Sequence, residues 1–271
     1  MALLLKPVDA RRGPRWIVDA FRLFARRPLG FTALFGVFLF AAMLLSLVPL
    51  LGSVVQMMML PLLSLGFMVA GQSALLDGTV HPRQFIEPLR TSPERRRALL
   101  TLCVLYGVLA IVILLLADAV SNSAWERMQR LIAKGDGAQA EIDALLAEPG
   151  VVTGSVLALV LGAALSVPFW HAPALVHWGG QGARQALFSS TVAVWRSKGA
   201  FLGYALAWGG VLFAFGLTTA MVFVALGAPQ MAGVLGLPAG LMFSTIFYLS
   251  VLFTFTDSFG GSPTVSTPRA D

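Results

Sequence analysis

Charged residues are scarce in this sequence. Asp, Glu, Lys and Arg make up 12% of the 271 residues, about half the share of a typical soluble domain. Hydrophobic residues make up 57%. So few charges cannot cover a surface that faces water, which indicates an integral membrane protein. The formal net charge of +6 then reflects loop bases that fix orientation and contact anionic headgroups of the lipid bilayer, with no nucleic-acid partner.

Residues that carry chemistry are equally scarce. The one cysteine, Cys103, lies inside an apolar run and excludes an intrachain disulfide. His171 and His177 are six residues apart and miss the i, i+4 spacing of helical metal pairs. Because Trp170 and Trp178 adjoin them, we expect both histidines at headgroup level. No nucleophile elbow, phosphate-binding glycine loop or HExxH motif is present. The sequence predicts no enzyme activity, no cofactor and no metal.

Charge-free stretches divide the chain into membrane spans. A helix needs about 20 apolar residues to cross the hydrocarbon core, and two of the stretches have room for two spans each, with turns at Pro49 and at Pro229. The predicted fold is all-α, a polytopic bundle of six transmembrane helices. The expected spans are 28–48, 53–76, 98–117, 150–169, 200–226 and 230–256. They form a domain over 28–256, between an N-terminal segment 1–27 and a tail 257–271.

The basic residues predict the orientation. Sixteen of the 19 lysines and arginines fall before span 1, between spans 2 and 3, between spans 4 and 5, or after span 6. The loop 118–149 carries the other three among six acidic residues. By the positive-inside rule both termini are cytoplasmic, and the loop is periplasmic. We therefore expect a multi-pass membrane protein with this orientation.

The N-terminal segment contains an amphipathic helix over residues 15–26. Trp16, Ile17, Ala20 and Phe21 recur at helical spacing, while the charged residues face the other way. We expect this helix to lie at the cytoplasmic interface and lead into span 1. It would act either as an element that senses lipid or a partner, or simply as an elbow that fixes the topology.

Clusters of bases at the cytoplasmic ends of the spans are candidates for binding anionic lipid headgroups. A plain positive-inside role would need no ligand. The candidates are Arg26, Arg27, Arg95, Arg96, Arg97, Arg196 and Lys198.

The two polar segments outside the spans differ in character. In the loop 118–149, Ser123 and Glu126 fit a capping box, and a second short amphipathic piece follows. This predicts a small helical hairpin over the periplasmic face. The tail 257–271 is rich in Gly, Ser and Pro and is expected to be flexible.

Small residues and prolines in spans 2, 5 and 6 predict close helix packing and kinks. Pro61 in span 2 and Pro238 in span 6 should kink their helices. Small residues at helical spacing allow close approach, within the chain or between copies in a homo-oligomer or with a membrane-protein partner. They are Gly199, Gly203 and Ala207 in span 5, and Gly236 and Gly240 in span 6.

Polar side chains inside the spans are few and uncharged. Gln56, Gln72 and Thr219 could line a polar pathway, although such residues more often bond to neighbouring helices or to their own backbone. Because no span contains a charged residue, the spans lack the ionisable side chains that proton relays and carboxylate-coupled transport require.

Two stretches of the chain resemble each other. Phe24-Ala-Arg-Arg27-Pro28 precedes span 1, and Trp195-Arg-Ser-Lys198-Gly199 precedes span 5, each followed by a phenylalanine and a charge-free hairpin. A parallel duplication would explain this echo, and so would convergence on the same interfacial chemistry.

Taken together, several apolar and aromatic motifs resemble a family of uncharacterised multi-pass inner-membrane proteins found mainly in beta-proteobacteria. The resemblance implies a helical bundle in the inner membrane and no assigned activity. The motifs are Trp16-Ile-Val-Asp-Ala-Phe21, Leu44-Leu-Ser-Leu-Val-Pro-Leu-Leu-Gly52, Leu-Ser-Leu-Gly66-Phe-Met, Ala172-Pro-Ala-Leu-Val176, Trp195-Arg196 and Asp257-x-Phe259.

Two functional hypotheses follow. The first is a non-enzymatic integral membrane protein, a scaffold or accessory factor that works through helix packing and contacts with the lipid interface. The second is a transporter or lipid-handling protein for a neutral or lipidic cargo. A water-accessible cavity at mid-membrane would favour the second, and a packed interior would favour the first.

Overall fold

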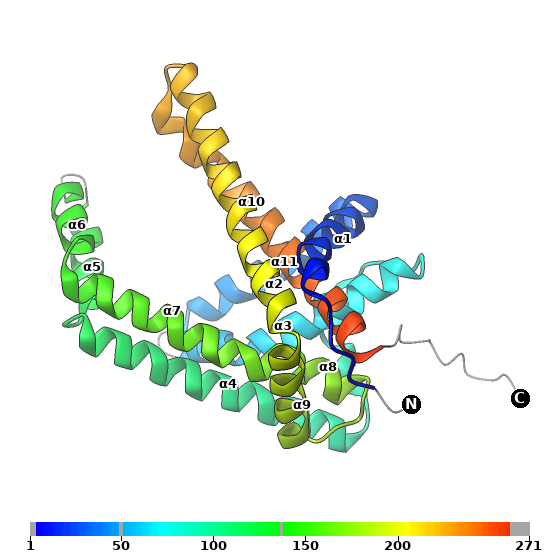
Figure 1. Ribbon diagram of the computed structural model, residues 1–271. Helices are drawn as coiled ribbons and strands as arrows, with labels where there is room; N and C mark the ends of the chain where they lie inside the picture. Colours follow the sequence, from blue (N-terminus) through cyan, green and yellow to red (C-terminus); the bar gives the residue numbers. More distant parts are fainter. Residues whose placement is uncertain (1–3, 49–50, 136–137, 261–271) are drawn as a thin grey trace, which may run out of the picture.

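The computed structural model describes residues 4–48, 51–135 and 138–260, and every regular element among them is helical (Figure 1). The long helices are α2 (Pro28–Ser46), α3 (Leu51–Leu75), α4 (Pro93–Val120), α7 (Pro149–Phe169), α10 (Lys198–Ala225) and α11 (Gly236–Phe259). The shorter α-helices are α1 (Gly13–Arg26), α5 (Ala124–Lys134), α6 (Gln139–Leu146), α8 (Ala172–His177) and α9 (Ala183–Arg196). Four 3-10 helices complete the described elements: η1 (Ala10–Arg12), η2 (Pro82–Phe85), η3 (Glu87–Arg90) and η4 (Pro229–Leu235).

Six helices of the described chain are long and apolar enough to cross a membrane, which confirms the predicted number and approximate positions of the spans. Four of them begin earlier than expected, at Leu51, Pro93, Pro149 and Lys198, and two of these first residues are prolines. Proline is suited to that position, since it lacks only an N–H that the first turn would leave unpaired.

The six long helices pair into three hairpins that spread from a common end (Figure 1). The hairpins are α2–α3, α4–α7 and α10–α11, and α5 and α6 lie at the far end of α4–α7. We call the common end the base; it holds α1, α8, α9 and residues 76–92. The far ends are called the tips. Two contacts tie the base together, from Arg27 to the carbonyl of Asp77 at 3.0 Å and from Arg95 to the carbonyl of His177 at 3.1 Å.

The interior is concentrated near the base. In the most apolar 18-residue stretch of α3, 56% of the residues are buried, against 6% in α10. Helix α3 therefore runs through the centre, while α10 presents most of its surface outward. Apolar side chains such as Leu212, Phe213 and Met221 are exposed on α10, which suits a surface in contact with lipid tails.

Three local expectations were wrong. Helix α8 is buried and does not run along the interface, with Ala172, Leu175 and Val176 fully covered. Pro238 lies in the first turn of α11, where it causes no kink, whereas Pro61 does lie inside α3. Ser123 adopts a left-handed conformation and makes no side-chain cap, so the capping box does not form. Instead, the carboxylate of Asp118 accepts a hydrogen bond from the backbone N–H of Trp125.

The loop 118–149 forms the short helices α5 and α6, as expected from its amphipathic pattern. Its three bases all form ion pairs at 2.7–2.8 Å. The pairs are Arg127–Glu148, Arg130–Glu126 and Lys134–Glu141. The tip of the α4–α7 hairpin therefore neutralises its own basic charges.

Candidate functional site

The amphipathic helix α1 is the centre of the base. Its apolar residues recur at positions i, i+1, i+4 and i+7, and the structure buries that face completely or almost completely. The buried residues are Trp16, Ile17, Ala20 and Leu23. Their neighbours are residues of α10 and α11, so the apolar face contacts protein. The amphipathic pattern is confirmed and its apolar face is covered by protein, while the expected position of the helix at the cytoplasmic interface stays a prediction.

Helix α1 approaches α10 closely because small residues line the contact. A Cβ on Gly13 would stand 2.0 Å from the carbonyl oxygen of Ala200, which no real atom could do without a backbone shift. On α10, Gly199 and Gly203 lie against Ala10 at the start of this segment. Gly199 and Gly203, two of the predicted packing glycines, thus allow the N-terminal segment to pack closely against α10.

An acidic residue at the end of α11 anchors α1. One carboxylate oxygen of Asp257 accepts hydrogen bonds from the indole Nε1 of Trp16 at 2.7 Å and from Nε of Arg12. The guanidinium of Arg12 also pairs with Asp19 at 3.0 Å. Partial burial by itself lowers the pKa of Arg12, but the hydrogen bond and charge of Asp257, and then those of Asp19, raise the pKa above its ordinary value.

The residues before α1 are tied to the same place. The backbone N–H of Lys6 donates to the carbonyl of Ser258 at 2.8 Å, and that of Val8 donates to the hydroxyl of Ser197 at 3.1 Å. These bonds join the N-terminal segment to the end of α11 and to the residue preceding α10. Asp257, Ser258 and Phe259 belong to α11, so the prediction that a flexible tail begins at 257 was wrong; the rest of that tail, 261–271, lies outside the described residues.

A polar cleft of about 530 Å³ opens beside this anchor. It lies between the N-terminal segment, η1, the start of α1 and the end of α11. Its charged lining consists of four bases and two acids: Lys6, Arg11, Arg12, Arg15, Asp9 and Asp257.

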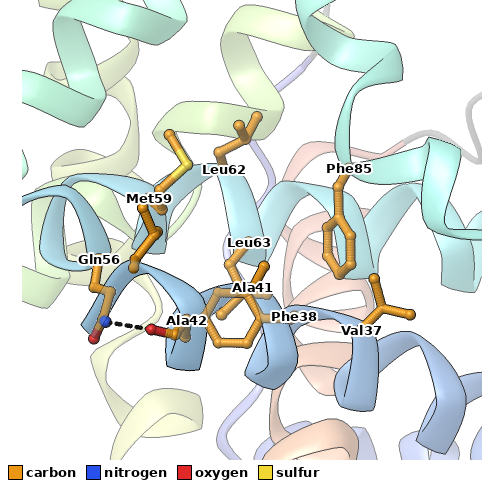
Figure 2. A pocket seen from close by; sticks show the side chains of 10 residues that line it. Val37, Phe38, Ala41, Ala42, Gln56, Met59, Leu62, Leu63 and Phe85 are labelled. Atoms are coloured by element: carbon orange, nitrogen blue, oxygen red, sulfur yellow. Dashed lines mark hydrogen bonds between the residues drawn. The ribbon is translucent and has the colours of Figure 1, made fainter. Parts of the chain in front are cut away.

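A second, apolar groove of about 170 Å³ lies between α2 and α3 (Figure 2). Phe38, Leu63 and Phe85 are among the residues that line it, and Gln56 is the polar one. The amide of Gln56 donates to the carbonyl of Ala42 at 2.7 Å and so bonds to the wall of the groove. The groove therefore offers hydrocarbon surface and no water-filled path.

The three residues of the suggested polar pathway do not meet in one cavity of the described chain. Gln56 lines the apolar groove, Gln72 lies 16 residues further along α3, and Thr219 lies near the tip end of α10. Sixteen helical residues span about 24 Å. One mid-membrane cavity lined by all three residues is therefore missing from the described chain.

The region around His171 is a packed polar core. Its side chain is fully buried, which overturns the expectation of a headgroup-level position. Thr254 lies 3.1 Å from Nε2 of His171 and also accepts a hydrogen bond from the indole of Trp170 at 3.0 Å. The backbone N–H of His171 donates to the hydroxyl of Ser190. These hydrogen bonds join the start of α8 to α9 and α11.

The candidate headgroup bases divide into two groups. Arg27 and Arg95 donate to backbone carbonyls and so help to hold the base together. The exposed ones are Arg26, Arg96, Arg97, Arg196 and Lys198. Lys198 lies over the ring of Trp195, 5.5 Å from its centre, and Trp195 is 71% exposed. An exposed tryptophan beside a lysine is typical of an interface anchor.

The remaining small residues of the predicted packing set behave differently. Ala207 is partly buried against the cluster around α1. Gly236 and Gly240 have no atom within 4 Å of an added Cβ, so they mediate no close approach within the described chain.

Sequence reasoning missed Asp257 as an anchoring residue. An acid directly after the last apolar residue of a span looks like an ordinary boundary charge. The sequence signal for this contact was the presence of both Asp257-x-Phe259 and Trp16-Ile-Val-Asp19 among the family motifs. Nothing in the sequence indicated that Trp16 and Asp257 contact each other.

Comparisons with known proteins agree with this membrane architecture. The chain is 33% identical over 255 residues to a Burkholderia thailandensis protein named "Probable inner membrane protein", and the match covers 93% of each chain. No family model matches, and no solved structure does. A likeness of this extent, over 93% of both chains, identifies a common family. The chain belongs to the family of this probable inner membrane protein and is a multi-pass protein of the inner membrane.

Proposed function

We propose that this protein is a non-enzymatic accessory or scaffold protein of the inner membrane, which works through helix packing and lipid-interface contacts. The observation that carries the proposal is the filled interior of the base. Trp16, Phe67 and Phe255 are among its fully buried side chains, and the polar groups of Asp257 and Thr254 bond to neighbouring helices. Such an interior stabilises one arrangement of three hairpins and leaves their outer faces for lipid or other proteins.

We also propose that the base faces the cytoplasm, so that both termini are cytoplasmic. The supporting argument is charge. The three basic residues of α5 are paired with acidic residues. At the base of the molecule, in contrast, arginines such as Arg96, Arg97 and Arg196 are exposed. Short loops on the cytoplasmic side of a membrane carry an excess of lysine and arginine.

Reporter fusions test this orientation. A reporter at the C-terminus and a reporter inserted between α5 and α6 should report the cytoplasm and the periplasm, respectively. The reverse result would invert the topology, and agreement between the two reporters would overturn the six-span arrangement.

The accessory role is tested by isolation with the surrounding membrane. The protein would be extracted in polymer-bounded native discs, and the lipids and proteins that remain with it would be identified by mass spectrometry. A six-span protein of unrelated sequence from the same membrane is the control. We expect specific partners or enriched anionic lipids. Recovery of nothing beyond the control would contradict the role.

Lipid handling is the second candidate, and the apolar groove between α2 and α3 favours it (Figure 2). Its volume of about 170 Å³ is suited to part of one acyl chain. A photoreactive fatty acid should then label residues such as Met59 and Leu62. The substitution Ala41→Phe should fill the groove and remove that labelling without loss of stability. Labelling spread evenly over the lipid-facing helices would contradict this candidate.

A further inference from the structure

The polar cleft at the start of α1 contains more basic than acidic groups, and its acids are already engaged. Asp257 accepts from Trp16 and Arg12, and the side chain of Asp9 accepts from the backbone N–H of Arg11 at 2.8 Å as the cap of η1. Neither acid forms an ion pair with Lys6, Arg11 or Arg15 within the described part of the chain. The cleft therefore has an unbalanced positive charge.

The three remaining cations come from different parts of the cleft wall. Arg11 and Arg15 are four residues apart at the junction of η1 and α1, so they lie on one side of this helical segment, and both are exposed. Lys6 lies against Gly260, the left-handed cap of α11, where its positive charge also suits the negative end of the helix. Like charges around one opening repel each other, and a bound anion would relieve that repulsion.

The depth of the cleft indicates which anion is available. Ala10 packs on Gly199 and Gly203, so the cleft is level with the first two turns of α10. Trp195 and Lys198 mark the lipid interface at that same end of α10. Lipid phosphates lie at this level, and arginine binds phosphate oxygens through paired N–H groups.

The basic surface continues from the cleft along α1. Its outward face carries Arg15, Val18, Arg22 and Arg26, spaced three or four residues apart and opposite the buried face. Among these, Arg22 makes an ion pair with Asp19 at 3.7 Å and is still 76% exposed at its side chain. A headgroup in the cleft would thus sit at one end of a row of bases that follows the membrane surface.

We propose that the cleft formed by Lys6, Arg11 and Arg15 beside the Arg12–Asp257 pair binds the phosphate of an anionic phospholipid headgroup. This rests on the proposed role of lipid contacts at the base and goes further by naming the residues and the ligand chemistry. The bound phosphate would add an anionic link between the N-terminal segment and α11. It would therefore strengthen the attachment of α1.

The test measures lipid-dependent stabilisation of the full-length purified protein. In zwitterionic detergent, the Tm is recorded without added lipid, with cardiolipin or phosphatidylglycerol, with phosphatidylcholine, and with inorganic phosphate or glycerol phosphate. We expect cardiolipin or phosphatidylglycerol to raise the Tm at moderate salt and phosphatidylcholine to leave it unchanged. A rise with inorganic phosphate alone would assign the cleft to soluble phosphate compounds and overturn the lipid assignment.

Matched variants locate the effect. Arg11→Gln/Arg15→Gln should lose the cardiolipin-dependent rise in Tm, whereas Arg83→Gln/Arg90→Gln, which removes the same charge from exposed positions at the same end of the molecule, should keep it. Arg11→Lys/Arg15→Lys should retain part of the rise, which separates charge from folding defects. Equal losses in both double variants would mean diffuse charge attraction and would overturn the cleft assignment while leaving the accessory role standing.

Discussion

Helices α1 and α9 have the same length and the same place before a hairpin, but opposite surfaces. Each has 14 residues and is separated by one residue from the first helix of a hairpin, α2 or α10. Helix α1 turns its large residues inward, and Trp16 is fully buried. In helix α9 the fully buried residues are all small, and Phe188 and Trp195 are each 71% exposed. We call these two helices the elbows. The comparison teaches that the elbow α1 stabilises the packing of the base, whereas the elbow α9 faces the lipid interface.

The echo between residues 24–31 and 195–201 falls on these two elbow-to-hairpin junctions. A parallel duplication would leave this shared order of a short helix and a hairpin. The different burial of the two elbows would then be a later divergence, with α1 inserted between α10 and α11. The duplication stays a prediction.

The largest effect should come from removing the buried ring of α1. Trp16→Ala should lower the free energy of unfolding by about 3–5 kcal/mol, because it leaves a cavity and removes one of the two hydrogen bonds to the carboxylate of Asp257. The measurement is denaturant unfolding in detergent micelles. Trp195→Ala on the other elbow is the matched control and should change the value by less than about 0.5 kcal/mol. Equal losses would erase the distinction between the two elbows.

The anchor of α1 should give the next largest effect. Asp257→Asn removes the charge that Arg12 and Trp16 share, and we expect a loss of about 1–3 kcal/mol, since the groups are only partly shielded from water. A double-mutant cycle with Arg12→Gln should show that the two losses are not additive. Additive losses would mean that the ion pair does not couple α1 to α11.

The start of each elbow provides a steric comparison. Gly13→Ala places a methyl group against the backbone of α10 and should cost about 1–3 kcal/mol. Gly182→Ala, at the cap of α9, meets no atom within 4 Å and should be close to neutral. Unfolding in the same detergent measures both. A neutral Gly13→Ala would show that α1 does not pack against α10 as closely as described.

The smallest effect on the protein itself should follow changes to the exposed residues of α9. Phe188→Ser with Trp195→Ser should leave the stability in detergent within about 0.5 kcal/mol of the parent. The same variant should lose stabilisation on transfer from detergent to bilayer discs, because an interfacial aromatic anchor is missing. The check is the difference in Tm between the two environments. An unchanged difference would count against α9 as an interface anchor.

The spans were predictable because charges are absent from them. Placing a charged group in hydrocarbon is unfavourable, so the positions of Arg27, Asp77 and Lys198 already mark where the hairpins begin or end. The apolar face of α1 was equally visible from the spacing of Trp16 and Ala20. Its partner was not visible, because a periodic pattern identifies a face to be covered and says nothing of whether lipid or protein covers it.

The candidate sites were less predictable for a related reason. The polar cleft joins residues 6–15 to Asp257, which lie at opposite ends of the chain and meet only through tertiary packing. The burial of His171 depends on Thr254 and Ser190, again far away in sequence. Flanking tryptophans suggested an interface, but Trp170 instead packs on Tyr204 and Phe247 inside the base.

The central claim is that the N-terminal segment packs within the base against α10. A cysteine pair at Ala10 and Gly199 tests it in native membranes, in a chain whose Cys103 is replaced by alanine. A Cβ on Gly199 would lie 3.3 Å from the Cβ of Ala10, close to the separation of about 3.5–4.5 Å in disulfides. A protease site between α5 and α6 allows the chain to be cut into an N-terminal and a C-terminal fragment. After mild oxidation and cleavage, the disulfide should hold the two fragments together, and reduction should separate them. Ala10→Cys with Gly236→Cys should not join them. Fragments that separate without reduction in the Ala10–Gly199 pair would contradict the account.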